Sequence, residues 1–157
     1  MSKLIGQSLR RREDHALLAG RGQYAGDITL PGLLHMAVVR SVHPHARLEQ
    51  VDLTAARALP GVVGAFALPD LPEIGGPMGD PVPQGLEGRS RPVLAHEKVR
   101  YVGEPIAVVV AEDPAQAADG AEAVEVEYAP IEGVGNVEAA LQPGAPTLSL
   151  PRRPTQR

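Results

Sequence analysis

The sequence predicts a single α+β domain with mixed, mostly short strands and short helices. Three observations point to this class: apolar runs of strand length recur along the chain, the helical patterns between them are short, and Gly and Pro separate them. The 157 residues include 17 Gly and 16 Pro, and 43% are hydrophobic, which is enough for one core. We expect the domain to span residues 1–145 and residues 146–157 to be a disordered tail.

Six segments are predicted to be strands because their apolar side chains alternate or run continuously. The continuous run at 106–112 (IAVVVAE) is typical of a buried central strand. Alternating Val and Glu at 124–128 predict a half-exposed strand. We expect mixed pairing, in which 47–52 can lie antiparallel to 33–40. In chain order the six segments are residues 33–40, 47–52, 62–68, 99–102, 106–112 and 124–128.

Four short helices are predicted, at residues 15–19, 55–59, 114–123 and 137–141. Each follows a residue that can accept the free N–H groups of a helix start: Asp14, Thr54, Asp113 and Asn136. Gly20 is expected to end the first helix in the left-handed conformation, and Pro114 suits the first position of the third. Gly120 inside the third helix costs about 1 kcal/mol relative to Ala. It therefore marks either close packing or a weak point.

The stretch from 69 to 91 is rich in Gly and Pro and shows no apolar period. A loop of this length inside a compact domain is unusual. We expect residues 75–90 to be the most mobile internal segment.

Charge and composition exclude several classes of function. The net charge is -4 and the aromatic residues are only three Tyr and one Phe, so a nucleic-acid-binding surface is not expected. The clustered basic residues, 10–12 and 152–153, fall near the ends of the chain. The absence of Cys excludes disulfides, a thiolate nucleophile and Cys-ligated zinc or iron–sulfur clusters. No apolar run reaches membrane-spanning length or resembles a signal peptide, so we expect a cytoplasmic protein without membrane contact.

The chemically suggestive motifs each have a simpler explanation. His43 and His45 flank Pro44, a spacing that can hold a metal, but Pro favours a turn and no third ligand is near. The carboxylates of Glu125 and Glu127 share a strand face that is expected to be exposed and solubilising. We assign no catalytic, cofactor-binding or metal-binding residue in this chain.

The segment 100–110 joins a tight Gly103-Glu104-Pro105 turn to the most apolar strand. With other segments in the same order, it makes the chain resemble the N-terminal a/b hammerhead domain of molybdenum hydroxylase large subunits. These form the xanthine dehydrogenase, aldehyde oxidase and aerobic carbon monoxide dehydrogenase superfamily. The matching segments are residues 12–14, 17–24, 27, 31–35, 39–46, 51–52, 55–56, 59–62, 100–110 and 117–130.

The resemblance implies an a/b hammerhead fold and an accessory role in a molybdenum-dependent oxidoreductase. The chain would dock onto a separate molybdopterin-binding chain and help to enclose the cofactor and substrate access, without being catalytic alone. Molybdopterin, 2Fe-2S clusters and FAD would then lie in partner chains, and none of the family's cofactor ligands maps onto this sequence. The alternative is a stand-alone binding module or an inert remnant without a catalytic partner.

We expect the docking role to leave an exposed apolar face, with self-association as a further possible consequence. The candidate interface residues are His43, His45, Gly103, Glu104 and Pro105, which lie in two predicted turns.

Overall fold

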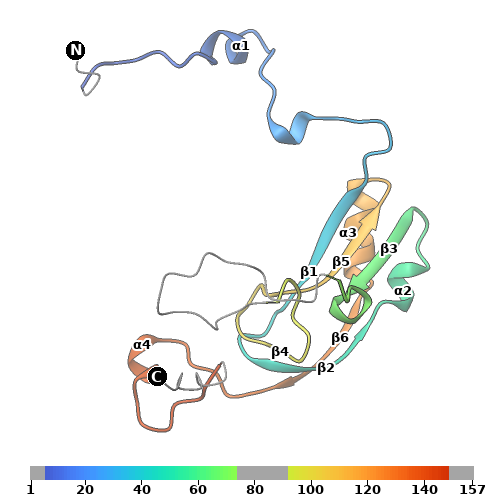
Figure 1. Ribbon diagram of the computed structural model, residues 1–157, viewed down its shortest axis with the longest axis vertical. Coiled ribbons are helices and arrows are strands. Elements are labelled where there is room, and N and C mark those ends of the chain that lie inside the picture. The colour runs from blue at the N-terminus through green and yellow to red at the C-terminus, as the bar shows by residue number, and fades with distance from the viewer. Residues whose placement is uncertain (1–5, 74–91, 149–157) are drawn as a thin grey trace. The chain divides into compact units, whose positions relative to one another are not determined.

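The computed structural model describes residues 6–73 and 92–148 (Figure 1). Two compact units are present, residues 1–33 and residues 34–157. The loop expected at 75–90 lies outside the described residues. So does most of the expected tail, from 149 onward.

The first unit contains two short helices, α1 (Asp14–Leu18) and the 3-10 turn η1 (Ala25–Asp27). The prediction that Asp14 caps α1 is wrong: the cap position is Glu13, and Asp14 lies in the first turn, 3.4 Å from the Nε of Arg11. Gly20 has φ +66°, which confirms the left-handed residue expected after this helix.

The second unit is built on two small sheets, and the first has the strand order β1-β5-β3. These strands are β1 (His35–Arg40), β5 (Pro105–Ala111) and β3 (Val62–Ala67). The central place of β5 confirms the expectation from its continuous apolar run. The helix α3 (Pro114–Glu122) packs against this sheet (Figure 1).

The second sheet has the order β4-β2-β6. Its strands are β4 (Lys98–Val99), β2 (Ala46–Asp52) and β6 (Glu125–Pro130). The α+β class is confirmed, but the expected mixed pairing is wrong, because every pair among the described strands is antiparallel. The suggested pairing of the first two strands is also wrong, since β1 and β2 belong to different sheets.

The helix caps are set by local hydrogen bonds. Asp113 accepts the N–H of Gln116 at 2.8 Å, which confirms the predicted start of α3. Asn136 likewise accepts a backbone N–H at 2.7 Å at the start of α4 (Val137–Ala140). Thr54 does not cap α2 (Thr54–Arg57) as predicted, because Asp52 accepts the Thr54 N–H at 2.8 Å instead. Hydrogen bonds from Thr54 lower the pKa of the Asp52 carboxyl.

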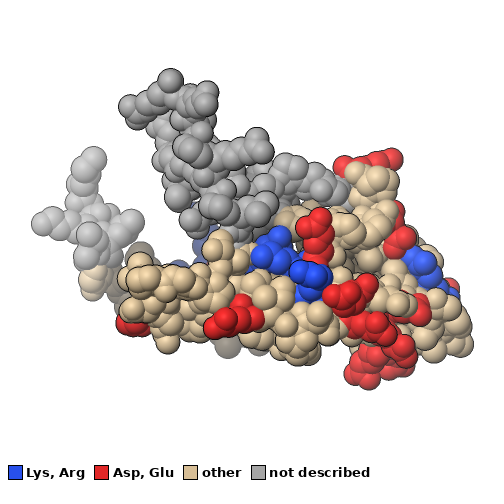
Figure 2. All heavy atoms as spheres, turned by 90° about the horizontal axis from the view of Figure 1, so that it is seen from below, with Lys and Arg blue, Asp and Glu red and all other residues tan. Residues whose placement is uncertain are grey.

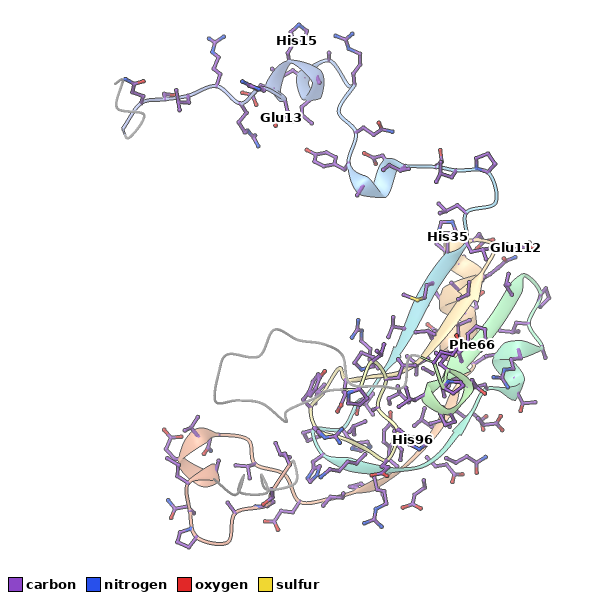
Figure 3. All side chains as sticks on the ribbon, viewed as in Figure 1. Glu13, His15, His35, Phe66, His96 and Glu112 are labelled. Atoms are coloured by element: carbon purple, nitrogen blue, oxygen red, sulfur yellow. The ribbon has the colours of Figure 1, made fainter. Side chains whose placement is uncertain are left out.

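The core consists of two clusters of mostly small apolar side chains. The first lies between the β1-β5-β3 sheet and its helices, and the second joins β5 to the other sheet. The buried members of the first are Leu53, Ala56, Ala65, Ala67, Ala107, Val109 and Val124. Those of the second are Ala46, Ala95, Val99 and Ile106. The large side chain of Phe66 lies on β3 and is only half-buried (Figure 3).

Gly120 of α3 is a position of close packing and not merely a weak point of the helix. A Cβ atom there would lie 2.7 Å from Cγ1 of Val109 and 3.2 Å from Cγ2 of Val62. The helix can approach the sheet this closely only because Gly120 has no side chain.

Candidate functional site

Two turns that are far apart in sequence lie side by side. The first, residues 41–45, follows β1, and the second, residues 100–104, precedes β5. The N–H of Ser41 donates to the carbonyl of Glu104 at 2.9 Å, and the N–H of Gly103 donates to the carbonyl of Ser41 at 2.8 Å. Nη1 of Arg40 also donates to the Gly103 carbonyl, at 3.0 Å. We call this pair of turns the two-turn junction; it contains four of the five candidate interface residues, and the fifth, Pro105, follows it as the first residue of β5.

A buried carboxylate closes the second turn. Glu104 is only 4% exposed, and its side chain accepts a hydrogen bond from the backbone N–H of Arg100. The Arg100 guanidinium lies 3.3 Å from the other carboxylate oxygen and also donates to the Lys98 carbonyl. Burying a carboxylate is costly unless it is paired and hydrogen-bonded, and here both conditions hold. Gly103, with φ +88°, supplies the left-handed residue that this turn requires.

The first turn is held by Ser41 and by an aromatic contact. The buried Ser41 hydroxyl donates to the His43 carbonyl at 2.9 Å and accepts the His43 N–H at 3.1 Å. The His43 ring meets the Tyr128 ring edge-on, with centroids 4.7 Å apart. Burial raises the pKa of the Tyr128 hydroxyl, against a smaller opposite effect of hydrogen bonding by Ser41.

His45 is a buried structural residue, only 4% exposed. Its Nδ1 lies 2.8 Å from the Glu132 carbonyl, which can only accept, so Nδ1 carries the proton. The Ile131 N–H donates to the His45 carbonyl at 3.0 Å. Within the described residues there is no group of three His, Cys, Asp or Glu that could hold a metal ion.

The edge of the two-turn junction carries exposed apolar side chains. Val42 is 71% exposed, Val102 62% and Tyr101 43%. Three such side chains on two adjoining turns are unusual for a surface that faces only water. None of these three side chains was among the candidate interface residues, and neither were Ser41 and Arg100, which hold the turns. The sequence does hint at the contact between Arg100 and Glu104, because these opposite charges are four residues apart.

One face of the β1-β5-β3 sheet is apolar in two adjacent rows of the register. In one row Val110 of β5 lies between Met36 of β1 and Gly64 of β3, and in the next Val108 lies between Val38 and Phe66. The core residues Ala107 and Val109 belong to the opposite face, on which α3 packs. We call Met36, Val38, Phe66, Val108 and Val110 the apolar sheet face. Met36 is 63% exposed and the other four are half-buried.

Among the described helices, none is both long and apolar enough to cross a membrane.

Comparison with known proteins gives consistent matches over most of the chain. The family model described as "Aldehyde oxidase and xanthine dehydrogenase, a/b hammerhead domain" matches residues 19–132. A 6-hydroxypseudooxynicotine dehydrogenase complex subunit gamma from Paenarthrobacter nicotinovorans is 41% identical over 87% of this chain. The carbon monoxide dehydrogenase large chain of Afipia carboxidovorans is 39% identical over 93% of it. In each case the matched region is 18% of the relative.

Solved structures show the same relation. The crystal structure of quinoline 2-oxidoreductase from Pseudomonas putida 86 superposes with a TM-score of 0.78 at 42% identity. The match covers 90% of this chain and 18% of that one. The chain thus spans less than a fifth of these relatives.

Proposed function

The chain belongs to the a/b hammerhead family of aldehyde oxidase and xanthine dehydrogenase, and from this premise we propose a docking role in a molybdenum hydroxylase-type oxidoreductase. It docks onto a separate molybdopterin-binding chain, helps to enclose the cofactor and substrate access, and is not catalytic alone. We propose that this assembly is cytoplasmic. A protein without Cys has no disulfide bond that the reducing conditions of the cytoplasm would break.

The relatives support a role within a larger assembly. Their names describe a complex subunit and a large chain, and more than four-fifths of each lies outside the matched region. The nicotinate dehydrogenase large molybdopterin subunit of Eubacterium barkeri is shorter, since the match covers 33% of it. Large subunits of different length therefore carry this region, which is consistent with an assembly divided among chains.

The apolar sheet face is the observation that carries the proposal. α3 packs on one face of the β1-β5-β3 sheet. On the other face the second sheet covers Ile106, but Met36 stays 63% exposed and Val38, Phe66, Val108 and Val110 are only half-buried. A second face without a single charged side chain in its two apolar rows is typical of a surface that another protein covers. Val42, Tyr101 and Val102 add apolar contacts at the two-turn junction.

We place the cofactors outside this chain. The sequence has no Cys for an iron–sulfur cluster. The described residues hold no cluster of metal-ligating side chains. A Cys-ligated cluster would therefore lie in another chain, and we propose the same for molybdopterin and FAD.

The proposal is tested by binding to a separately expressed molybdopterin-binding chain, for which the part of a relative's large chain outside the matched region can serve. We expect a one-to-one complex by size-exclusion chromatography with light scattering. Met36→Asp, on the apolar sheet face, and Val102→Asp, at the junction, should each weaken it about 30-fold, the effect of losing an interface residue worth about 2 kcal/mol. Val137→Asp is the matched control, because Val137 is equally apolar and 71% exposed on α4.

A strict monomer with no affinity for that chain would contradict the proposal and favour the stand-alone module or inert remnant. Self-association that both Asp variants abolish would show instead that a second copy covers the apolar sheet face.

A further inference from the structure

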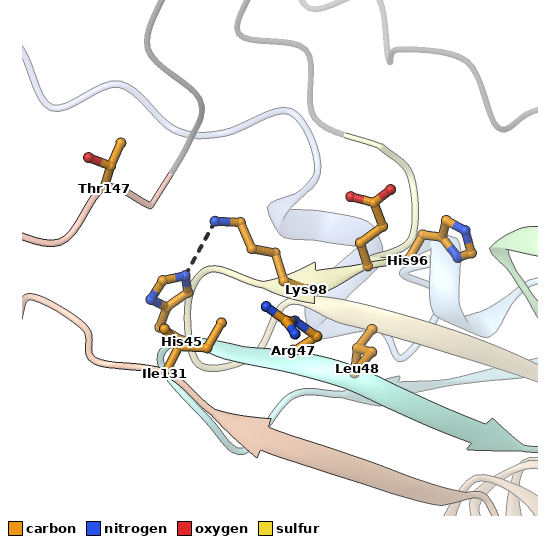
Figure 4. Close-up of a pocket in the computed structure, with 8 residues that line it drawn as sticks. His45, Arg47, Leu48, His96, Lys98, Ile131 and Thr147 are labelled. Atoms are coloured by element: carbon orange, nitrogen blue, oxygen red, sulfur yellow. Dashed lines mark hydrogen bonds between the residues drawn. The ribbon is translucent and has the colours of Figure 1, made fainter.

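A hollow of about 640 Å³ opens beside the second sheet, and His45 is the one residue of the two-turn junction among its lining residues. It lies at the start of β2, next to β4 and to the residue that follows β6, as Figure 4 shows. Its size is within the range of small-molecule sites, roughly 300–1,000 Å³. The residues that line it are His45, Arg47, Leu48, His96, Glu97, Lys98, Ile131 and Thr147.

Two of these residues are cations placed directly opposite each other. Arg47 of β2 and Lys98 of β4 are register partners in the antiparallel pair, so their side chains leave the same face of the sheet. Like charges at directly opposed positions destabilise a sheet. An anion between them would remove that repulsion and gain two charge-assisted hydrogen bonds.

His45 holds the Lys98 ammonium in place. Because Nδ1 of His45 donates to the Glu132 carbonyl at 2.8 Å, its Nε2 is left as an acceptor. Nζ of Lys98 lies 3.4 Å from that Nε2, the contact drawn in Figure 4. The ring is buried and cannot turn freely, so the ammonium is positioned while two of its three N–H donors stay available for another acceptor.

Within the described residues, no ion pair neutralises Arg47 or Lys98. Within the part of the chain that the structure describes, the ion pairs join Arg11 to Asp14, Arg57 to Asp70 and Arg100 to Glu104. None of them involves Arg47 or Lys98, although Glu97 is among the lining residues. Figure 2 shows Lys and Arg side chains gathered together on one face, with carboxylates beside them.

We propose that this hollow binds a small organic anion through its phosphate or carboxylate group. Arg47 offers two parallel N–H donors and Lys98 a positioned point charge, the two kinds of contact that such groups prefer. His96, exposed at the rim, adds a further ring nitrogen. Leu48 and Ile131 form an apolar wall for the rest of the molecule. Anion binding here does not depend on the docking role, although His45 belongs both to this lining and to the two-turn junction.

The experiment is titration of the full chain with phenyl phosphate, benzoate, inorganic phosphate and phenol, followed by amide chemical shifts in NMR. The two organic anions should cause saturable shifts around β2 and β4 with a Kd on the order of 1 mM. Inorganic phosphate should bind more weakly, because it gains nothing from Leu48 and Ile131. Phenol, which has no charge, should not bind saturably.

Variants then identify the cations. Arg47→Gln and Lys98→Gln should each weaken phenyl phosphate binding about ten-fold or more, while Lys98→Arg retains most of it. Arg12→Gln is the control, since it removes the same charge from an exposed residue of the first unit. Arg47 is exposed, so its variant should fold normally. Equal binding by Arg47→Gln, Lys98→Gln and Arg12→Gln, or saturable binding of phenol as tight as that of phenyl phosphate, would overturn the proposal.

Discussion

Replacing Glu104 by Ala should lower the free energy of unfolding by about 2–3 kcal/mol. The larger part comes from the partly buried Arg100 N–H, which loses its carboxylate acceptor, a cost of about 1–3 kcal/mol. The Arg100 guanidinium adds about 1 kcal/mol or less, because its side chain is 30% exposed and can turn to water. Glu104→Gln keeps an acceptor for the N–H and should cost only about 1 kcal/mol.

Urea denaturation followed by circular dichroism measures both variants. Glu125→Ala is the matched control, because Glu125 is an exposed carboxylate on β6, and it should change stability by about 0.5 kcal/mol or less. If Glu104→Ala stays within about 0.5 kcal/mol of the original chain, the buried carboxylate does not hold the turn. Equal losses for the Ala and Gln variants would show that packing, not the hydrogen bond to Arg100, is what Glu104 contributes.

Two further predictions concern α3 and Tyr128. Gly120→Ala gains about 1 kcal/mol of helix propensity but overpacks against Val109 and Val62 at a cost of about 1–3 kcal/mol. Its melting temperature should therefore fall, whereas Gly135→Ala, with open space at the new Cβ, should be near neutral; an unchanged Gly120→Ala would contradict the close packing. Because burial raises the pKa of Tyr128 above its ordinary 10.0, the stability it contributes is complete below that pH and is lost as the pH rises through the folded-state pKa. Absorbance titration should show tyrosinate forming above the ordinary range, and Tyr128→Phe should remove that part; an unchanged curve would refute the assignment.

The two predicted turns show how far reasoning from the sequence reached. His43, His45 and residues 103–105 were predicted together as borders of one docking face, and the structure places their two turns in contact. The selection did not include Ser41 or Arg100, whose hydrogen bonds hold these turns. Whether the five candidate residues contact a partner stays a prediction.

Local features of the fold could be read from the sequence because short-range interactions determine them. Asp113 and Asn136 cap helices within three residues of themselves, Gly20 adopts its left-handed conformation, and the apolar run of β5 marks the central strand. Each follows from backbone geometry or from the apolar pattern of one segment.

Strand partners and surface chemistry were decided only by the tertiary structure. The patterns of β1 and β2 do not say that they enter different sheets, and no local signal opposes Arg47 to Lys98. The apolar pattern of a single strand also does not say whether one or both faces of its sheet are covered. By itself the sequence determined the α+β class, the family resemblance and most elements. The apolar sheet face and the cationic hollow arise from register between distant strands, which depends on how all segments pack together.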